Sequence, residues 1–208
     1  MKSLPDRIVI VGAGGHAKVV IATVRAAGGD VVVAYDDDRA RWGQQILGVP
    51  IKGPVSGDEI GSTPAIIAIG NNRSRQAMTE RLQAQWVSVC HPDTTVHRSV
   101  SLGPGTVVFA GVVIQPDTTI GAHAILNTSA SLDHDCIVAD FVHVGPGAHL
   151  CGGVTIDEGV LLGVGTSIAP NVEIGSWSTA GAGAVCVVDV PRDTTVVGVP
   201  ARSVGADA

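Results

Sequence analysis

Two patterns in the sequence predict a small parallel α/β unit followed by a β-helix built from hexapeptide repeats. In the first, an apolar residue stands at every sixth position from Val96 to Cys186, and all sixteen members except Ala180 and Cys186 are Leu, Ile or Val. The second is an alternation of apolar runs, a glycine-rich turn and helical patterns before residue 90. A period of six matches neither a helix nor an alternating strand, and it is typical of a hexapeptide β-helix.

Three hexads make one coil of eighteen residues around a triangular prism, with each large aliphatic residue directed at the axis. Four places after each lies a second series, from Val100 to Val190, in which every member is small or β-branched. Stacked coils bury a continuous core that no single coil could bury. Six glycines are expected where the backbone must turn sharply: Gly103, Gly121, Gly145, Gly163, Gly175 and Gly181.

The region before the repeats has the pattern of a parallel α/β unit with right-handed crossovers. Strands are predicted at Arg7 to Val11, Val31 to Tyr35, Ala65 to Ile69 and Trp86 to Val89, and helices at Lys18 to Ala27 and Ser74 to Gln85. His91-Pro92 indicates a short, stiff boundary, because proline restricts the residue before it to extended backbone. We therefore expect an α/β domain at 1–90 and a β-helix domain at 91–208 that ends in a short tail.

Three strand ends of the α/β unit carry the residue types of a ligand site. They are Gly12–Gly15, Asp36-Asp37 and Gly70-Asn71. The glycine turn alone fits a phosphate site and a ligand-free tight turn equally well. Parallel sheets bind ligands at the carboxyl ends of their strands, so the three ends together favour a ligand. The unit is half of a two-lobed dinucleotide domain, and its size favours a nucleotide or nucleotide-sugar.

Composition excludes several classes of partner. The net charge is −6 with no basic run, which argues against nucleic acid and acidic membranes. The sequence has no 18-residue apolar stretch and no signal-peptide pattern, so we expect a cytoplasmic protein without membrane insertion. None of the four cysteines, Cys90, Cys136, Cys151 and Cys186, forms a CxxC pair, and small buried thiols are expected rather than a disulfide or metal site.

One coil of the repeat region carries a candidate general base. His134 is the third residue of its hexad, which directs it outward, and Asp133 and Asp135 flank it. An exposed histidine is usually only surface, but a carboxylate beside it can fix the ring tautomer and raise its basicity. His143 and His149 follow in the same region, and three converging histidines would instead suit a zinc site.

The motifs GAGGHAK at Gly12–Lys18, DDD at Asp36–Asp38, IGNN at Ile69–Asn72, HP at His91-Pro92, NTSASLDHD at Asn127–Asp135 and GVPAR at Gly198–Arg202 occur in this order. With them the chain resembles the bacterial hexapeptide acyltransferases grouped with the sialic-acid O-acetyltransferases. Within that group it is most similar to N-acetyltransferases of UDP- or GDP-linked amino sugars. The resemblance covers nearly the whole chain.

The resemblance implies a left-handed β-helix, a homotrimer and acetyl-CoA bound in the groove between neighbouring prisms, with no metal. It implies that His134 is the general base and that Asp135 orients it. Relatives have Glu at that position, so the shorter Asp135 leaves Asp133 as an alternative. It also implies acetyl-CoA contacts at His143, Gly152, Val164 and Ala182, and nucleotide-sugar contacts at Gly12, Ala13, Gly14, Gly15, Asp36, Asp37, Gly70 and Asn71.

The expected activity is therefore direct transfer of acetyl from acetyl-CoA to the amino group of a nucleotide-linked sugar. Three alternatives remain open: O-acetylation of a sialic-acid-like sugar, a metal-bound hydratase, and a non-catalytic scaffold. Hydratases of this fold lack the α/β domain with its glycine turn. The sequence does not specify the sugar, the nucleotide or the pathway.

Overall fold

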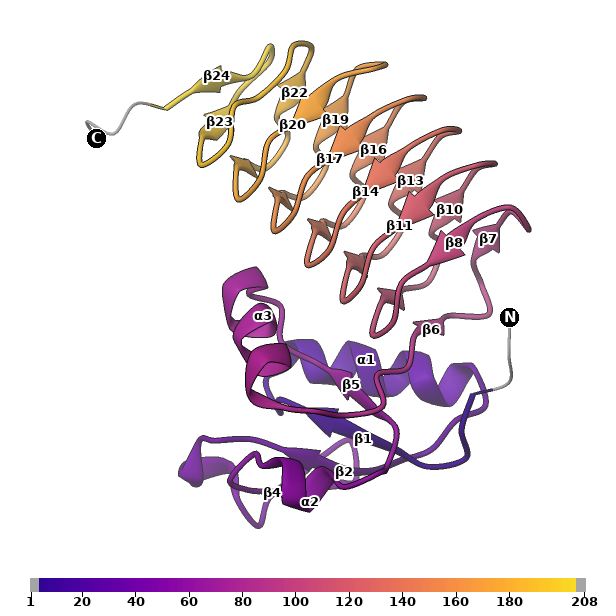
Figure 1. Ribbon diagram of the computed structural model, residues 1–208, viewed down its shortest axis with the longest axis vertical. Coiled ribbons are helices and arrows are strands. Elements are labelled where there is room, and N and C mark those ends of the chain that lie inside the picture. Colours follow the sequence, from indigo (N-terminus) through magenta and orange to yellow (C-terminus); the bar gives the residue numbers. More distant parts are fainter. Residues whose placement is uncertain (1–3, 205–208) are drawn as a thin grey trace.

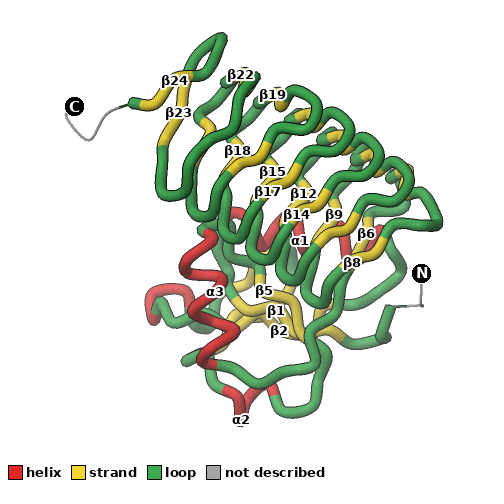
Figure 2. The backbone as a smooth tube through the Cα atoms, turned by 45° about the horizontal axis from the view of Figure 1, so that its top comes forward, coloured by secondary structure: helices red, strands yellow, loops and turns green. Residues whose placement is uncertain are grey.

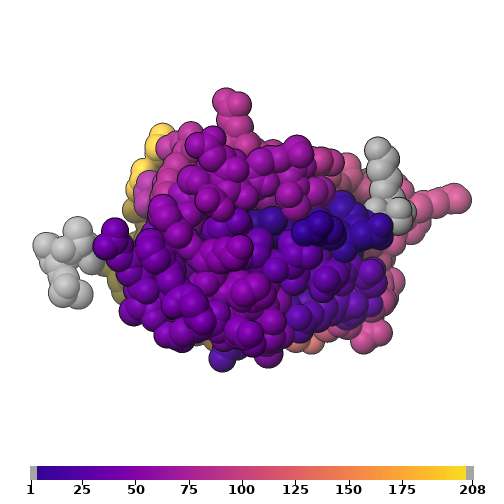
Figure 3. Space-filling model, turned by 90° about the horizontal axis from the view of Figure 1, so that it is seen from below, coloured from indigo at the N-terminus to yellow at the C-terminus, as the bar shows by residue number. Residues whose placement is uncertain are grey.

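The computed structural model describes residues 4–204 and has two parts, a small α/β domain and a triangular prism of stacked coils (Figure 1). The α/β domain lies at the end where the prism begins, and it covers most of that end when seen from below (Figure 3). Within residues 4–204, no helix combines the length and apolar character needed to span a bilayer.

The α/β domain is built on one sheet with strand order β3-β4-β2-β1-β5. Its strands β1, β2, β4 and β5 are parallel, and β3 pairs with β4 as an antiparallel hairpin. The predicted strands β1 and β2 are confirmed, but the hairpin and α2 have no counterpart among the predicted elements. The elements are β1 Ile8–Val11, α1 Gly15–Ala26, β2 Val31–Tyr35, η1 Arg39–Arg41, β3 Gln45–Ile46, β4 Val49–Lys52, α2 Gly57–Ile60, β5 Ala65–Ile67 and α3 Asn72–Arg81.

Helix α1 lies between the sheet and the prism, so one core joins the two parts (Figure 1). Its residues Val20, Ile21 and Val24 belong to the same buried cluster as sheet residues and as Phe109 and Ile125 of the prism. The opposite side of the sheet buries a separate cluster that includes Tyr35. The α/β domain and the prism are therefore packed against each other and are not joined by a free linker.

The prism has three sheets of short strands, one on each face (Figure 2), and all their pairings are parallel except that of β23 with β24. The first face holds β7 Thr95–Val96, β10 Val113–Ile114, β13 Ser131–Leu132, β16 His149–Leu150, β19 Ser167–Ile168 and β22 Val185–Cys186. The second holds β8 Ser101–Leu102, β11 Thr119–Ile120, β14 Ile137–Val138, β17 Thr155–Ile156 and β20 Glu173–Ile174. The third holds β6 Val89–Cys90, β9 Val107–Val108, β12 Ile125–Leu126, β15 His143–Val144, β18 Leu161–Leu162, β21 Thr179–Ala180, β23 Thr195–Val197 and β24 Arg202–Ser203.

The predicted period is confirmed by the strand register. Ile114 pairs with Leu132 and Leu132 with Leu150, each eighteen residues apart, and both apolar series form one buried cluster along the axis. Cys136 and Cys186 are buried in it as free thiols. Polar members of the second series are also satisfied, since the Thr106 hydroxyl donates to the Gly121 carbonyl oxygen at 2.7 Å.

The six glycines assigned to sharp turns have a different reason. Left-handed backbone does occur at every sixth residue, but two places further on, and Asp117, Asp135 and Asn171 are among the residues that adopt it. At Gly103 and Gly145 a Cβ would lie 2.4 Å from backbone atoms of the next coil. Close stacking of the coils, not the torsion angle, therefore excludes a side chain at these positions.

Three predicted boundaries also change. Trp86 to Val89 does not form a fourth strand of the α/β sheet, because Trp86 makes only an isolated bridge with Ala65 and Val89–Cys90 pairs with β9 of the prism. His91 N–H donates to the Val108 carbonyl oxygen at 2.8 Å, so His91 lies inside the first coil. The prism thus begins two residues before the boundary placed at 90 and 91. Helix α3 starts and ends earlier than predicted.

The prism has three edges, called the His134, Arg75 and Val164 edges after a residue that lies on the edge or contacts it. The His134 edge follows the first face and includes 133–136 and 151–154. The Arg75 edge follows the second face and includes 121–124, 139–142 and 157–160. The Val164 edge follows the third face and includes 127–130, 163–166 and 181–184.

One buried and two half-buried histidines make stability depend on pH. Burial, the largest cause in each case, lowers the pKa values of His16, His123 and His143 from 6.5 to about 4. Below pH 6.5 the unfolded chain binds protons that the folded chain does not. We therefore expect the free energy of unfolding to fall between pH 6.5 and 4, by up to about 1.4 kcal/mol per pH unit for each histidine. Urea unfolding at pH 7, 6 and 5 measures this slope.

The variant His123→Phe isolates the contribution of one of these three histidines to the pH dependence. His123 stacks on Phe141 with ring centroids 5.5 Å apart, and Phe141 occupies the equivalent left-handed position one coil later. His123→Phe should therefore fold, remain within about 1.5 kcal/mol of the parent at pH 7, and reduce the slope by one histidine's share. An unchanged slope in His123→Phe would contradict the assignment.

Candidate functional site

The predicted ligand residues of the α/β domain lie around one cavity of about 340 Å³. Six of the eight line it: Gly12, Gly14, Gly15, Asp36, Asp37 and Gly70. Ala13 is buried beside them, and Asn71 caps α3 by accepting from Ser74 N–H at 2.9 Å. A larger cavity of about 820 Å³, lined by Val96 and Leu102 among others, contains none of the predicted residues.

In the glycine turn, the fold requires Gly12, whereas Gly14 and Gly15 border open space. Gly12 has φ +101°, and a Cβ there would lie 2.8 Å from Ile69 Cγ1. At Gly14 and Gly15 a Cβ would meet no atom of the described chain within 4 Å. Within residues 4–204 no side chain caps the first turn of α1, so the N–H groups of Gly15 and His16 and the positive end of the helix dipole are available to an anion at the cavity.

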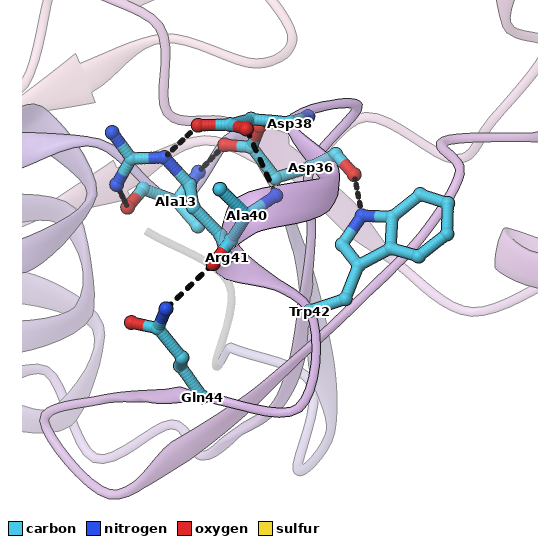
Figure 4. Close-up of polar contacts among 7 residues, drawn as sticks. All are labelled: Ala13, Asp36, Asp38, Ala40, Arg41, Trp42 and Gln44. Carbon is cyan, nitrogen blue, oxygen red and sulfur yellow. Dashed lines mark hydrogen bonds and ion pairs between the residues drawn. The ribbon is translucent and has the colours of Figure 1, made fainter.

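Asp36 shapes this turn (Figure 4). Its Oδ2 accepts from Ala13 N–H at 2.7 Å and its Oδ1 from Asp38 N–H at 2.9 Å. Arg41 donates to the Ala13 carbonyl oxygen at 3.0 Å and to Asp38 at 3.2 Å. Both oxygens of Asp36 are thus engaged by backbone, and the side chain supports the turn from within the cavity wall.

Asp37, the second predicted aspartate, is paired with α3. Arg81 donates to its carboxylate at 2.6 Å, and Val55 N–H donates at 3.0 Å. The hydrogen bond from Arg81, opposed in part by burial, lowers the pKa of Asp37. Since both side chains are about half exposed, the pair contributes little to stability. Asp37 therefore lines the cavity as a carboxylate that is already paired with the Arg81 guanidinium.

His143 lies against this cavity and its ring is fixed on both nitrogens. Its Nδ1 lies 3.3 Å from the Gly70 carbonyl oxygen and its Nε2 lies 3.0 Å from Asn127 Nδ2. Thr128 N–H donates to Asn127 Oδ1, which turns the amide nitrogen toward the ring. His143 is consequently neutral, with Nδ1 carrying the proton and Nε2 accepting. The predicted acetyl-CoA residue thus contacts Gly70, one of the residues that line the cavity.

Sequence reasoning missed His16 as a site residue. It lines the cavity, its ring centroid is 6.2 Å from that of His143, and its Nε2 is buried without a hydrogen-bond partner among the described residues. Its place inside the GGHAK motif was the available signal. Asn127 was likewise missed, although it opens the motif that contains His134.

His134 lies on an edge of the prism and not on the third face, which carries His143, and it is exposed, as predicted. Its Nδ1 is 2.8 Å from Asp135 Oδ2, so the shorter aspartate reaches the ring, and the ring is 66% exposed. Asp135 has φ 60°, a left-handed conformation that Asp tolerates better than most residues. A Cβ at Gly152 would lie 2.8 Å from His134 Nε2, so the free nitrogen lies over that glycine.

The remaining predicted contacts lie elsewhere. Val164, which is 56% exposed, and Ala182 lie on the Val164 edge, one face away from His134 and Gly152. One chain therefore does not bring the predicted acetyl-CoA residues together.

The three histidines of the metal alternative are also separated. His134 lies on an edge, His143 on the third face and His149 on the first face, where its Nδ1 is 2.8 Å from the Ser131 hydroxyl. Among the described residues, no three His, Cys, Asp or Glu side chains form a group that could hold a metal ion.

Comparison with known proteins identifies the family. Residues 7–82 match the PglD N-terminal domain. PerB from Caulobacter crescentus, solved in complex with CoA and GDP-perosamine, is 42% identical, and the superposition has a TM-score of 0.88 and covers 95% of this chain and 97% of PerB. The chain belongs to the family of nucleotide-amino-sugar N-acetyltransferases built on hexapeptide repeats. Its prism is accordingly the left-handed parallel β-helix that the resemblance implied.

Three further relatives are similar to this chain. The acetyltransferase domain of PglB from Neisseria gonorrhoeae FA1090, solved with acetyl coenzyme A, is 36% identical with a TM-score of 0.86, and the match covers 96% of this chain and 99% of that domain. GDP-perosamine N-acetyltransferase from Escherichia coli O157:H7 is 30% identical over 65% of each chain. Serine acetyltransferase from Escherichia coli K12 matches at 32% identity over 64% of this chain and 45% of its own length. The chain thus spans between about half and two thirds of these curated relatives.

The open space at Gly14 allows a test of the predicted nucleotide site. Gly14→Val should fold, because a Cβ at this position meets no protein atom within 4 Å, but it should fill the space that a phosphate would occupy. We expect calorimetry to show at least a tenfold loss of affinity for GDP or UDP. Gly57→Val is the matched control, since Gly57 has equally open surroundings and lies outside the cavity. Equal losses in both variants would contradict the site.

Proposed function

We propose that this protein transfers the acetyl group of acetyl-CoA to the amino group of a UDP- or GDP-linked amino sugar, with His134 as general base. The single observation that carries the proposal is the pairing of His134 Nδ1 with Asp135 at 2.8 Å, which leaves Nε2 free beside Gly152. The cavity at the glycine turn supports a nucleotide-linked acceptor. The similarity to PerB, whose structure contains CoA and GDP-perosamine, supports the pairing of these two substrates.

The geometry suits direct transfer. The amine nitrogen attacks the thioester carbonyl carbon, and its proton passes to His134 Nε2. The carbon–sulfur bond then breaks, and the imidazolium returns a proton to the leaving thiolate. Asp135 holds the ring in the required tautomer and stabilises the imidazolium that forms. A nucleophilic side chain is not required.

An oxyanion site is available next to the base. Gly152 N–H has no hydrogen-bond acceptor within residues 4–204, although the carbonyl of the same residue accepts from Asn171 N–H at 3.1 Å. A backbone N–H beside the reacting carbonyl can stabilise the developing negative charge. A Cβ here would lie 2.6 Å from His134 Cε1, so glycine is the residue that leaves the ring in this position.

The active form that fits these positions is a homotrimer. His134 and Gly152 lie on one edge of the prism, whereas Val164 and Ala182 lie on another, and the nucleotide cavity adjoins the third face. A groove between neighbouring prisms would bring the His134 edge of one copy to the Val164 edge of the next. Acetyl-CoA in that groove would contact both sets of residues.

The proposed activity is tested by mixing the protein with acetyl-CoA and a panel of UDP- and GDP-linked amino sugars and measuring released thiol. Thiol release that requires the sugar amine supports the proposal. Release with hydroxyl-only acceptors would instead support O-acetylation of a sialic-acid-like sugar. No acetyl transfer to any acceptor would favour a binding role for the prism.

The base is tested by His134→Ala. We expect kcat to fall by about 10²-fold or more, because general-base help is lost, while GDP and CoA still bind. Steady-state kinetics and calorimetry on the same preparation separate the two effects. Unchanged kcat in His134→Ala would remove it from the mechanism.

The two flanking aspartates provide an internal control for that test. Asp135→Asn should lower kcat by about tenfold or more, because the ring loses the partner that fixes its tautomer. Asp133→Asn should do little, since Asp133 side-chain oxygens accept no hydrogen bond within the described chain. A larger loss in Asp133→Asn would transfer the orienting role to Asp133.

Assembly is tested by light scattering. The expected mass is three times the 21.0 kDa of one chain. Mixing inactive His134→Ala with an inactive variant of the Val164 edge, such as Val164→Glu, should restore part of the activity, since mixed trimers contain one intact groove. A stable, fully active monomer at micromolar concentration would contradict the trimer.

A further inference from the structure

The guanidinium of Arg75, on α3, is buried where the α/β domain meets the prism. The residue is 1% exposed. Its Nε donates to the His123 carbonyl oxygen and its Nη2 to the Phe141 carbonyl oxygen, both at 2.8 Å, on two successive coils of the Arg75 edge. Its Nη1 donates to the carbonyl oxygens of Ile69 at 3.0 Å and Gly70 at 3.2 Å, at the end of β5. One side chain thus ties both parts of the protein together.

Asn72 extends this contact to a third coil. Its Oδ1 accepts from Arg75 Nη2 at 2.9 Å, and its Nδ2 donates to the carbonyl oxygens of Gly159 and Val160 at 3.0 Å each. Within residues 4–204 no carboxylate pairs with Arg75. Burial lowers the pKa of Arg75 to about 10, so the group is still charged at neutral pH. The charge is solvated by main-chain carbonyls alone, apart from one amide oxygen.

The Gly70 carbonyl oxygen connects Arg75 to the site. It accepts from Arg75 Nη1 and lies 3.3 Å from His143 Nδ1, and Gly70 itself lines the nucleotide cavity. Any shift of this carbonyl therefore moves a wall of the cavity and removes the acceptor that fixes the His143 tautomer.

We propose that Arg75 is a positioning residue for acetyl transfer: it holds the Gly70 carbonyl, which orients His143, and so fixes the nucleotide cavity relative to the prism. This inference rests on the proposed function only for its effect on turnover. The rival role is that of a structural tie between the domains, which would affect stability alone.

Lysine separates these two roles because it keeps the charge and loses the planar fork. An ammonium is a point donor and cannot bind carbonyls on two coils and a strand end at fixed angles. In Arg75→Lys we expect the ¹⁵N NMR signals of His143 to change from a single Nδ1–H tautomer to a mixture. We also expect kcat/KM for the nucleotide amino sugar to fall at least tenfold in the folded protein at 25 °C.

A variant on the same helix serves as the control. Arg73 stacks on Trp177 at 4.3 Å and so also joins α3 to the prism, but no contact with Gly70 is among its interactions. Arg73→Lys should lower Tm and leave the His143 tautomer and kcat/KM within twofold. If Arg75→Lys does not fold, Arg75→Gln, which brings no charge into the buried site, is measured in the same way.

The outcomes decide between the roles. A lower Tm with an unchanged His143 spectrum and kcat/KM in the Arg75 variant overturns the proposal. So does an equal change of the His143 spectrum in the Arg73 control. The NMR measurement needs no turnover, so it can fail while the proposed function stands, and absence of acetyl transfer by the parent protein would refute the function without altering the NMR result.

Discussion

Between residues 89 and 186 the coils of this protein pair residue by residue with the coil eighteen positions later, and the rest of the structure depends on that register. It stacks the aliphatic series along the axis, where burial of each side chain contributes about 1.5–3 kcal/mol relative to exposure. It also repeats each edge at fixed spacing, so that carbonyl groups of successive coils align in columns. The α/β domain uses such a column: Arg75 and Asn72 bond to the same corner of three coils. An isolated buried guanidinium would cost several kcal/mol, and the aligned carbonyls offset that cost.

The same register explains which parts of the fold could be predicted from sequence. The prism is a repeat, so a period of six specifies strands, inward positions and the outward direction of His134 together. The reason for Gly103 and Gly145 could not be predicted, because it depends on how closely neighbouring coils approach, which is a distance between residues far apart in the chain. The β3–β4 hairpin was missed because its strands are short and contain Pro50, a residue that usually argues against a strand.

The candidate site was predictable to the extent that it lies in short motifs. Glycines at strand ends and a histidine flanked by aspartates are visible in the sequence, and six of the eight predicted nucleotide residues line one cavity. His16, Asn127 and Arg75 were missed because their chemistry comes from tertiary contacts: a ring nitrogen buried without a partner, an amide facing a histidine, and a guanidinium between two domains. An isolated Arg on a polar helix carries no such signal.

The division of the site over three regions of the prism follows from the geometry of a triangular coil. Outward residues diverge at each corner, so one chain cannot gather an acyl donor, an acceptor and a base at a single point. The cavity at the glycine turn is joined through Gly70 and Arg75 to the Arg75 edge, whereas the side chain of His134, on another edge, is 66% exposed. In the proposed trimer these groups would converge between neighbouring copies, and water would be excluded from His134 only when a second prism covers that edge. The proposed base, His134, is therefore exposed in a single chain because that chain supplies only one side of the proposed groove.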